Sequence, residues 1–307
     1  MRSSDASRDR LLDKVLLANL VAEILIIGTG GLVRVTGSGL GCPTWPQCVP
    51  GSYVPVREQA EGFHKYIEFG NRTLTGALGF IALAALWAVW TRTDRRRSLV
   101  VPAVLVLVGI AAQAILGGIT VRTGLHPGTV AAHFLLSGVL VALSAYLWLR
   151  SREPNGPMSS TVRAPIPAVA YATTALGVLV LVLGTIVTGS GPHSGDADQP
   201  ARLGFNPRSV SWLHADAVML FIGLVFAVWL ASRIVGETQR PGRAWAMVLG
   251  VTALQGLVGY TQYALKLPEV LVVTHMLLAA LLIVALVNGL MSLRDVPREQ
   301  PRSGRGA

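Results

Sequence analysis

The sequence predicts an all-α polytopic membrane protein whose eight transmembrane helices form two pseudo-symmetric four-helix bundles. Three observations support this fold class. The 307 residues are 52% hydrophobic and only 14% charged, with a mean hydropathy of +0.55, which is too apolar for a soluble domain. The chain contains eight apolar stretches of membrane-spanning length. Its second half repeats motifs of its first half.

Each apolar stretch is close to the ~20 residues that cross ~30 Å of hydrocarbon. The stretches cover 15–34, 67–90, 99–121, 128–149, 165–187, 210–232, 244–263 and 270–291. Residues 1–14 are polar, and the first stretch runs into a glycine-rich segment without a small-residue cleavage motif. We therefore expect no cleaved signal peptide.

The formal net charge of +10 is explained by membrane topology. Most Lys and Arg residues lie beside helix ends, in the N-terminal tail, the even-numbered connections and the C-terminal tail. The positive-inside rule makes these segments cytoplasmic, so both termini of this multi-pass cell-membrane protein are expected in the cytoplasm. Because the basic residues set topology in this way, we expect no nucleic-acid partner.

An internal repeat divides the chain into two halves. Residues 113–133 align without gaps on 255–275, an offset of 142, and the sequence VTGSG at 35–39 recurs at 187–191. Each repeat holds four helices, and four crossings return the chain to its starting side. The halves should therefore share one orientation, about a pseudo-two-fold axis along the membrane normal.

The repeat and the polar segments predict five regions. They are a cytoplasmic N-tail at 1–14, an N-terminal four-helix half at 15–149, a cytoplasmic linker at 150–164, a C-terminal four-helix half at 165–292 and a cytoplasmic tail at 293–307. We expect the Arg-rich tail after Asp295 to be disordered.

Cys42 and Cys48 lie in the long outer loop at 35–66, on the side of the membrane where disulfides persist. The five residues between them include two prolines and can bring the Cα atoms within bridging range. Two interpretations stay open, a structural clip on the loop and a redox-active or haem-handling pair. Two thiols without a nearby histidine do not predict a metal site.

His214 and His275 each lie about five residues inside the outer end of an apolar stretch, which is a depth of ~7 Å. Imidazole is costly to bury in a bilayer, so two matched examples indicate a ligand. Antiparallel hairpins give both helices the same direction, so the two imidazoles can face one haem iron in the bundle core. The competing interpretation is a pair of unrelated, hydrogen-bonded histidines.

The first half offers a different pair of positions. His133 matches His275, but Asn71 takes the place of His214, and an amide is a poor iron ligand. The first half therefore has one obvious axial ligand, unless His64 bends in. An open coordination position suits substrate or oxygen chemistry.

Glu68 precedes Asn71 by three residues and shares its helix face. A carboxylate at this place is a candidate proton acceptor or donor. The alternative is a carboxylate that merely favours the positive end of the helix dipole. Glu23 lies in the middle of the first stretch, where a carboxylate is costly, and we assign it no role.

Other polar residues lie at the outer ends of the helices. Three of them are candidates for binding haem propionates or lipid phosphates, with lipid or water as the default partner: Arg34, Arg72 and Arg122. His126 and His193 are expected to be solvated loop residues.

With these residues identified, the chain resembles the haem A synthase family across about 15–292. The resemblance rests on the two four-helix repeats, the cysteine pair in the first outer loop, the Glu-x-x-x-Arg element at 68–72 and the histidines at 133, 214 and 275. It implies oxidation of the C8 methyl group of haem O, the substrate, to a formyl group, giving haem A for cytochrome c oxidase. It also implies a haem b cofactor whose iron is held by His214 and His275.

For the N-terminal half, the resemblance implies a substrate-haem site with Glu68 important for catalysis. The family motif is Glu-x-x-His, whereas this chain has Asn71 at the last position. The residues expected at the substrate haem are therefore His133, Asn71, Arg72 and His64. The implied partners are a haem O synthase and an aa3-type cytochrome c oxidase, together with membrane lipid. The electron acceptor and any homo-oligomer are left open.

Two other functions fit the sequence less well. A bis-His membrane b-type cytochrome for electron transfer would place ligands at both membrane faces, whereas all candidates here lie on the outer side. A small-molecule transporter would need broken helices and polar sites at the midplane, for which only Glu23, Gln113 and Gln255 are candidates.

Overall fold

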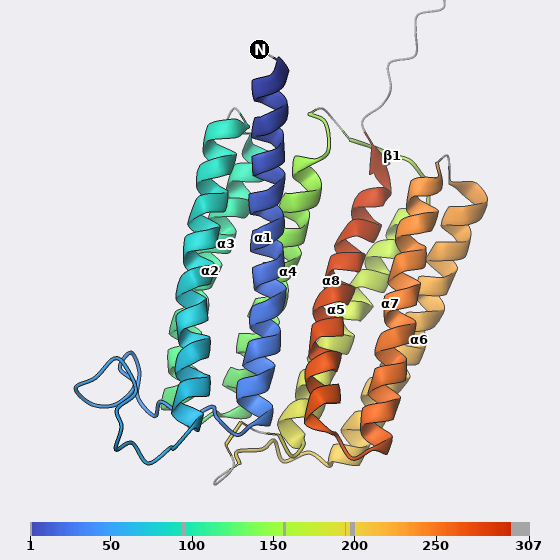
Figure 1. The fold of residues 1–307 in the computed structure, drawn as a ribbon. Helices are drawn as coiled ribbons and strands as arrows, with labels where there is room; N and C mark the ends of the chain where they lie inside the picture. Colours follow the sequence, from blue (N-terminus) through green and yellow to red (C-terminus); the bar gives the residue numbers. More distant parts are fainter. Residues whose placement is uncertain are drawn as a thin grey trace, which may run out of the picture.

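The computed structural model describes residues 2–93, 96–155, 158–193, 195–196, 200–236 and 238–295, most of which lie in long helices (Figure 1). The helices are α1 (Arg2–Val35), α2 (His64–Arg92), α3 (Arg97–Arg122), α4 (Pro127–Ser151), α5 (Ile166–Ser190), α6 (Pro207–Val235), α7 (Gln239–Ala264) and α8 (Glu269–Ser292). Two-residue strands β1 (Ser159–Ser160) and β2 (Arg294–Asp295) pair antiparallel. All 8 helices are long and apolar enough to cross a membrane, so the predicted all-α polytopic fold is confirmed.

Most helices extend beyond the apolar stretches that predicted them. Helix α1 begins at Arg2, so most of the expected N-tail at 1–14 is helical. His126, expected as a solvated loop residue, caps α4, because its Nδ1 accepts a hydrogen bond from the N–H of Gly128 at 3.2 Å. Asn206 caps α6 in the same way. Hydropathy cannot locate such polar caps, which satisfy the free N–H groups of the first turn. The expected disorder after Asp295 lies outside the described residues.

Helices α1 to α4 form one bundle and α5 to α8 form another beside it (Figure 1). Within each bundle the helices pack in a ring, so that α2 and α4 are diagonal and do not touch, and neither do α6 and α8 in the described residues. The bundles meet through α4 on α8, α1 on α8 and α4 on α5. Exchanging each helix with its repeat partner leaves this pattern of contacts unchanged, as a pseudo-two-fold axis requires.

The two ends of the bundles carry different features (Figure 1). The end with the start of α1 and the strands β1 and β2 is here named the terminal face. The opposite end, which carries residues 36–63, is named the loop face. At the terminal face the buried Glu153 forms ion pairs with Arg150 (3.4 Å), Arg240 (3.0 Å) and Arg294 (3.9 Å), which belong to α4, α7 and β2. One carboxylate thus connects both bundles and the segment that follows α8.

Candidate functional site

Three histidines inside the bundles are packed in the same way. The ring edge formed by Cε1 and Nδ1 lies against a glycine of the neighbouring helix in each case: His133 against Gly117, His214 against Gly184 and His275 against Gly259. A Cβ atom at these glycines would lie 3.3, 3.4 and 3.2 Å from Cε1, respectively. A larger residue would press on the rings of His133 and His275, whereas at Gly184 the added Cβ would make an ordinary contact with His214. The Nε2 atoms are farther than 4 Å from each of these positions, so Nε2 points away from the packed helix.

The hydrogen bonding of these rings is incomplete. The Nδ1 atoms of His133, His214 and His275 are buried and make no hydrogen bond of acceptable geometry with any residue that the structure describes. The backbone of Val180 lies near His214, and that of Gln255 near His275, four residues before the glycine in each helix. Buried polar atoms normally have partners. The backbone carbonyls of Val180 and Gln255 are thus the partners available to Nδ1 of His214 and His275, an arrangement shared by metal-bound and ordinary core histidines.

His214 and His275 come from the diagonal helices α6 and α8, which leave the centre of the C-terminal bundle between them. The two rings are close enough to interact electrostatically. They lie seven and six residues beyond the first residue of their helices, or ~10 Å, which is deeper than expected because the helices begin earlier. A porphyrin supplies four nitrogen ligands of its own, so two imidazoles complete the coordination of a haem iron. In the described part of the chain, no group of three or more His, Cys, Asp and Glu residues could hold a metal ion.

The N-terminal bundle holds one imidazole and one amide at the matching positions. His133 lies on α4, and Asn71 lies on the diagonal helix α2. The Oδ1 atom of Asn71 accepts a hydrogen bond from the Thr29 hydroxyl of α1 at 2.7 Å. Beside Thr29, a Cβ atom on Gly30 would meet nothing within 4 Å. This half therefore offers one imidazole and one fixed amide.

Glu68 is buried and its two oxygens face donors from both sides. Oε1 accepts from Nε and Nη2 of Arg72 at 3.0 and 2.5 Å, and Oε2 accepts from the N–H of Cys42. Arg72 also donates to the carbonyl oxygens of Cys42 (2.7 Å), Thr44 (2.9 Å) and Gln47 (3.3 Å). The pair thus fastens the cysteine loop to α2. Glu68 is the fifth residue of α2, past the first turn where a carboxylate meets the free N–H groups.

The cysteine loop covers the loop face of the N-terminal bundle. Cys42 and Cys48 form a disulfide. Between them, the indole of Trp45 lies directly on Gly118 of α3, where any Cβ atom would overlap it. Arg122 donates to the Trp45 carbonyl at 3.0 Å and its guanidinium lies 5.6 Å from the indole centroid. The loop is therefore held by α2 and α3 together.

Three other predicted residues lie at the loop face. His64 is the first residue of α2, and its Nδ1 is 2.8 Å from the Ser38 hydroxyl, ~10 Å along the helix from Asn71. The structure therefore does not bring His64 to the level of Asn71. Arg34 donates to the Thr188 carbonyl at 3.1 Å, which joins the ends of α1 and α5. Burial and the nearby Arg34 hold the pKa of His193 below its ordinary value.

Sequence reasoning found the histidines but missed their supports. Gly117 and Gly259 were not assigned to the site, although their identical spacing from His133 and His275 in the two repeats was a signal of pairing. Thr29 gave no signal, because a threonine in an apolar helix is unremarkable.

Comparison with known proteins identifies a family whose sequence model matches this chain. Residues 13–194 match the sequence model of a family described as cytochrome oxidase assembly protein. This match includes the N-terminal bundle from residue 13 of α1 onward, together with α5, and so contains the cysteine loop, Glu68, Asn71 and His133.

Individual relatives have modest identity. A protein of Bacillus cereus named haem A synthase is 27% identical over 251 residues, which are 77% of this chain and 79% of that protein. Proteins of the same name from Halalkalibacterium halodurans and Geobacillus kaustophilus are each 32% identical, over 142 and 143 residues. The chain spans less than half the length of these last two relatives, at 46% and 43%.

Proposed function

This chain belongs to the cytochrome oxidase assembly protein family, and from that membership we propose that it is a haem A synthase, an oxidoreductase that converts the C8 methyl group of haem O to a formyl group. Its family ties it to haem A biosynthesis, and its eight apolar helices make it a multi-pass membrane protein. The substrate, the reaction and the roles of individual residues below are our proposal.

The observation that carries this proposal is the unequal use of one repeated arrangement. The C-terminal bundle has two glycine-packed histidines on diagonal helices, His214 and His275. The N-terminal bundle has one, His133, opposite an amide. Two imidazoles would leave no coordination position of a haem iron open, which suits a resident electron-transfer haem. A single imidazole would leave one position open, which suits a haem that is itself the substrate.

We assign the residues accordingly. His214 and His275 would hold the iron of a haem b, which supplies one-electron transfer when bound. His133 and Asn71 would bind haem O, with Arg72 and His64 nearer the loop face. Arg34 and Arg122 lie near enough to the loop face to meet propionates, and each already donates to one backbone carbonyl.

Glu68 is our proposed catalytic carboxylate. Its oxygens accept three hydrogen bonds, two from Arg72 at Oε1 and one from the N–H of Cys42 at Oε2, which leaves one lone-pair position on Oε2 for a proton. A shift of the cysteine loop would release the Cys42 donor. Catalysis by Glu68 is therefore expected to depend on the position of that loop, whether the disulfide serves as a clip or takes part in redox chemistry.

The cellular setting follows from the same proposal. The basic terminal face would be cytoplasmic by the positive-inside rule, with the cysteine loop outside the cell membrane. A haem O synthase would supply the substrate and an aa3-type cytochrome c oxidase would receive the product.

Co-expression with a haem O synthase in a host that lacks haem A tests the function. Extracted haems are separated by mass from the wild type, from Glu68→Ala and from Glu58→Ala, which changes an exposed carboxylate in the same loop. We expect haem A from the wild type and Glu58→Ala, and at least ~100-fold less from Glu68→Ala.

Two results would count against the proposal. Bound haem b with unconverted haem O in the well-expressed wild type would favour the bis-His cytochrome. Haem A from Glu68→Ala at the wild-type level would retain the synthase and remove Glu68 from catalysis.

A further inference from the structure

Glu23 is a buried carboxyl that the proposed reaction has not yet used. It is 1% exposed, and it lies in the middle of the membrane span Arg10–Val35. Its Oε1 atom is buried without a hydrogen-bond partner among the described residues, and none of the ion pairs found there includes it. Unpaired ionisable groups at this depth are costly and typically mark a route for protons or ions.

Glu23 faces α4. One turn toward the terminal face, Asn19 donates to the Ser144 hydroxyl of α4 at 2.9 Å, and residues four apart share a helix face. About one turn toward the loop face, Gln113 donates to the Ser137 hydroxyl of α4 at 2.5 Å. Glu23 therefore lies at a depth between two hydrogen-bonded polar pairs.

This row of polar groups leads to the proposed substrate site. The amide of Gln113 also donates to the backbone carbonyl of His133, at 3.0 Å. Asn19 and Ser144 are hydrogen-bonded and so lie at one level. Toward the loop face, Gly30 is eleven residues along α1 from Asn19, and His133 is eleven residues along α4 from Ser144. Gly30 and His133 therefore also lie at one level. Gly30 is on the same face of α1 as Glu23, and a Cβ atom there would meet open space.

The C-terminal bundle lacks this row. By the repeat offsets, the counterparts of Glu23 and Asn19 are Ala175 and Tyr171. The counterparts of Ser137 and Ser144 are Ala279 and Leu286. Only the glutamine is kept, as Gln255. A purely structural polar seam has no reason to occur in one bundle alone, whereas a proton route is needed only where hydrogen is removed.

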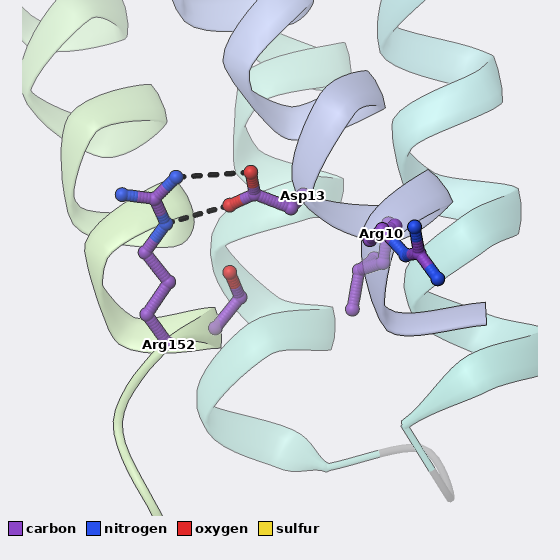
Figure 2. Close-up of a pocket in the computed structure, with 5 residues that line it drawn as sticks. Arg10, Asp13 and Arg152 are labelled. Carbon is purple, nitrogen blue, oxygen red and sulfur yellow. Dashed lines mark hydrogen bonds and ion pairs between the residues drawn. The ribbon is translucent and has the colours of Figure 1, made fainter. Parts of the chain in front are cut away.

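At the terminal face the same two helices border a cavity of about 440 Å³ (Figure 2). Asp13 and Ser151 line it, and Asp13 accepts from Arg152 at 2.6 and 2.9 Å. The cavity begins ~9 Å along α1 from Asn19. Leu16 and Leu147 fill the interval and are both fully buried. Water reaches the cavity, so a proton leaving Glu23 has to cross nearly three helical turns to reach solvent.

We propose that Glu23 is a second proton acceptor for the N-terminal haem site, in addition to Glu68, and delivers protons along the α1–α4 seam toward the terminal face. The inference rests on the proposed function. Its final oxidation is R–CH2OH → R–CHO + 2 H⁺ + 2 e⁻, with both electrons passing singly to one-electron carriers. Such carriers take no protons, so protein groups must take them.

The segments of the neighbouring helices that pack around Glu23 offer no other charged group to accept the proton. The helices packed on α1 carry no charged side chain at 73–91 of α2, 134–149 of α4 or 276–292 of α8. In those three segments the sole group with an ionisable proton is the phenol of Tyr146, one turn from the end of α4.

Purified full-length protein loaded with haem O tests the proposal. Haem A formation is timed in H2O and D2O for the wild type, Glu23→Gln, Glu23→Asp and Thr173→Val. Thr173 is a buried hydroxyl of α5 that bonds only its own helix, so its variant is the matched control. We expect Glu23→Gln to be ~100-fold slower with a larger solvent isotope effect, Glu23→Asp to recover part of the rate, and Thr173→Val to match the wild type.

A second measurement does not depend on turnover. Redox-induced infrared difference spectra of the wild type should contain a carboxyl C=O band that shifts in D2O and is missing in Glu23→Gln. A wild-type rate and isotope effect in Glu23→Gln would overturn the proposal. A wild type that makes no haem A would instead overturn the synthase itself.

If Glu23→Gln does not fold, as judged by loss of the absorption of the haem at His214 and His275, Asn19→Leu and Ser144→Ala take its place. Both keep the carboxyl and interrupt the row. Slow, isotope-sensitive turnover in these variants supports the route, and wild-type turnover in both overturns it.

Discussion

At the residue scale, the hydrogen bond from Thr29 to Asn71 limits what the N-terminal bundle can bind. An amide that is held through Oδ1 directs that oxygen to α1 and away from the bundle centre. His133 then has no imidazole opposite it. Under our proposal, this one side chain distinguishes the bundle with two haem ligands from the bundle with one.

Asn71→His should convert the N-terminal site into a second bis-His site. The new imidazole would stand opposite His133 as His214 stands opposite His275. In oxidised protein loaded with haem O, we expect about twice the low-spin haem signal per chain in electron paramagnetic resonance, with haem A formation retained because the family motif has a histidine at this position. Asn288→His, at the terminal end of α8, is the control and should leave the spectrum unchanged. An unchanged spectrum in Asn71→His would show that residue 71 does not face the iron.

At the element scale, pairs of neighbouring helices set the position of each of the three histidine rings. A glycine on α3, α5 or α7 admits the ring from the next helix, and the ring edge rests on the glycine surface. The bundle interior is close-packed, so a methyl group added at Gly117 or Gly259 cannot be absorbed without moving the ring.

Gly259→Ala should displace the His275 ring, since the new Cβ would lie 3.2 Å from Cε1. We expect retention of the C-terminal haem to fall ~10-fold, the usual scale for losing a support of a metal ligand, measured by haem transfer to an apo-acceptor protein. Gly250→Ala on the same helix meets nothing within 4 Å and should keep or slightly raise stability, because alanine favours helix. Equal haem retention in the two variants would contradict the role given to Gly259.

The sequence predicts the helices more readily than the residues that hold the site side chains in place. Eight apolar stretches predict eight helices because backbone N–H and C=O groups without hydrogen bonds are too costly in free energy within lipid. The matched histidines stand out for a similar reason, since imidazole is costly in hydrocarbon. The partners of Glu68 do not stand out, because Cys42 and Thr44 belong to a loop whose path follows no periodic pattern. Helix ends were also missed where polar caps, such as His126, extend the helix past the apolar run.

At the scale of the whole molecule, Glu153 is the charged group that joins the two bundles at the terminal face. Its carboxylate is 7% exposed and pairs with three arginines, and the guanidinium of Arg96 at the start of α3 donates to its backbone carbonyl at 3.0 Å. Removing one buried anion from such a cluster leaves several cations without compensation.

Glu153→Ala is expected to destabilise the protein by about 2–3 kcal/mol. The figure is below that of a fully buried pair because Arg240 and Arg294 are 42% and 35% exposed and are screened by solvent. Thermal unfolding in detergent measures it, with Glu58→Ala as the exposed control that should change little. A midpoint equal to that of the control would mean that the cluster is held by other contacts.

The matched helix contacts between the bundles have a consequence for ancestry. A surface that meets its own repeat copy about a two-fold axis is the geometry of a symmetric homodimer. The chain can be regarded as two protomers fused end to end. Identical protomers must carry the same residue at equivalent positions. A homodimer could therefore not have His214 in one protomer and Asn71 at the equivalent position of the other, nor Glu23 in one protomer alone. Fusion removed that constraint, and the two copies were free to diverge into different tasks.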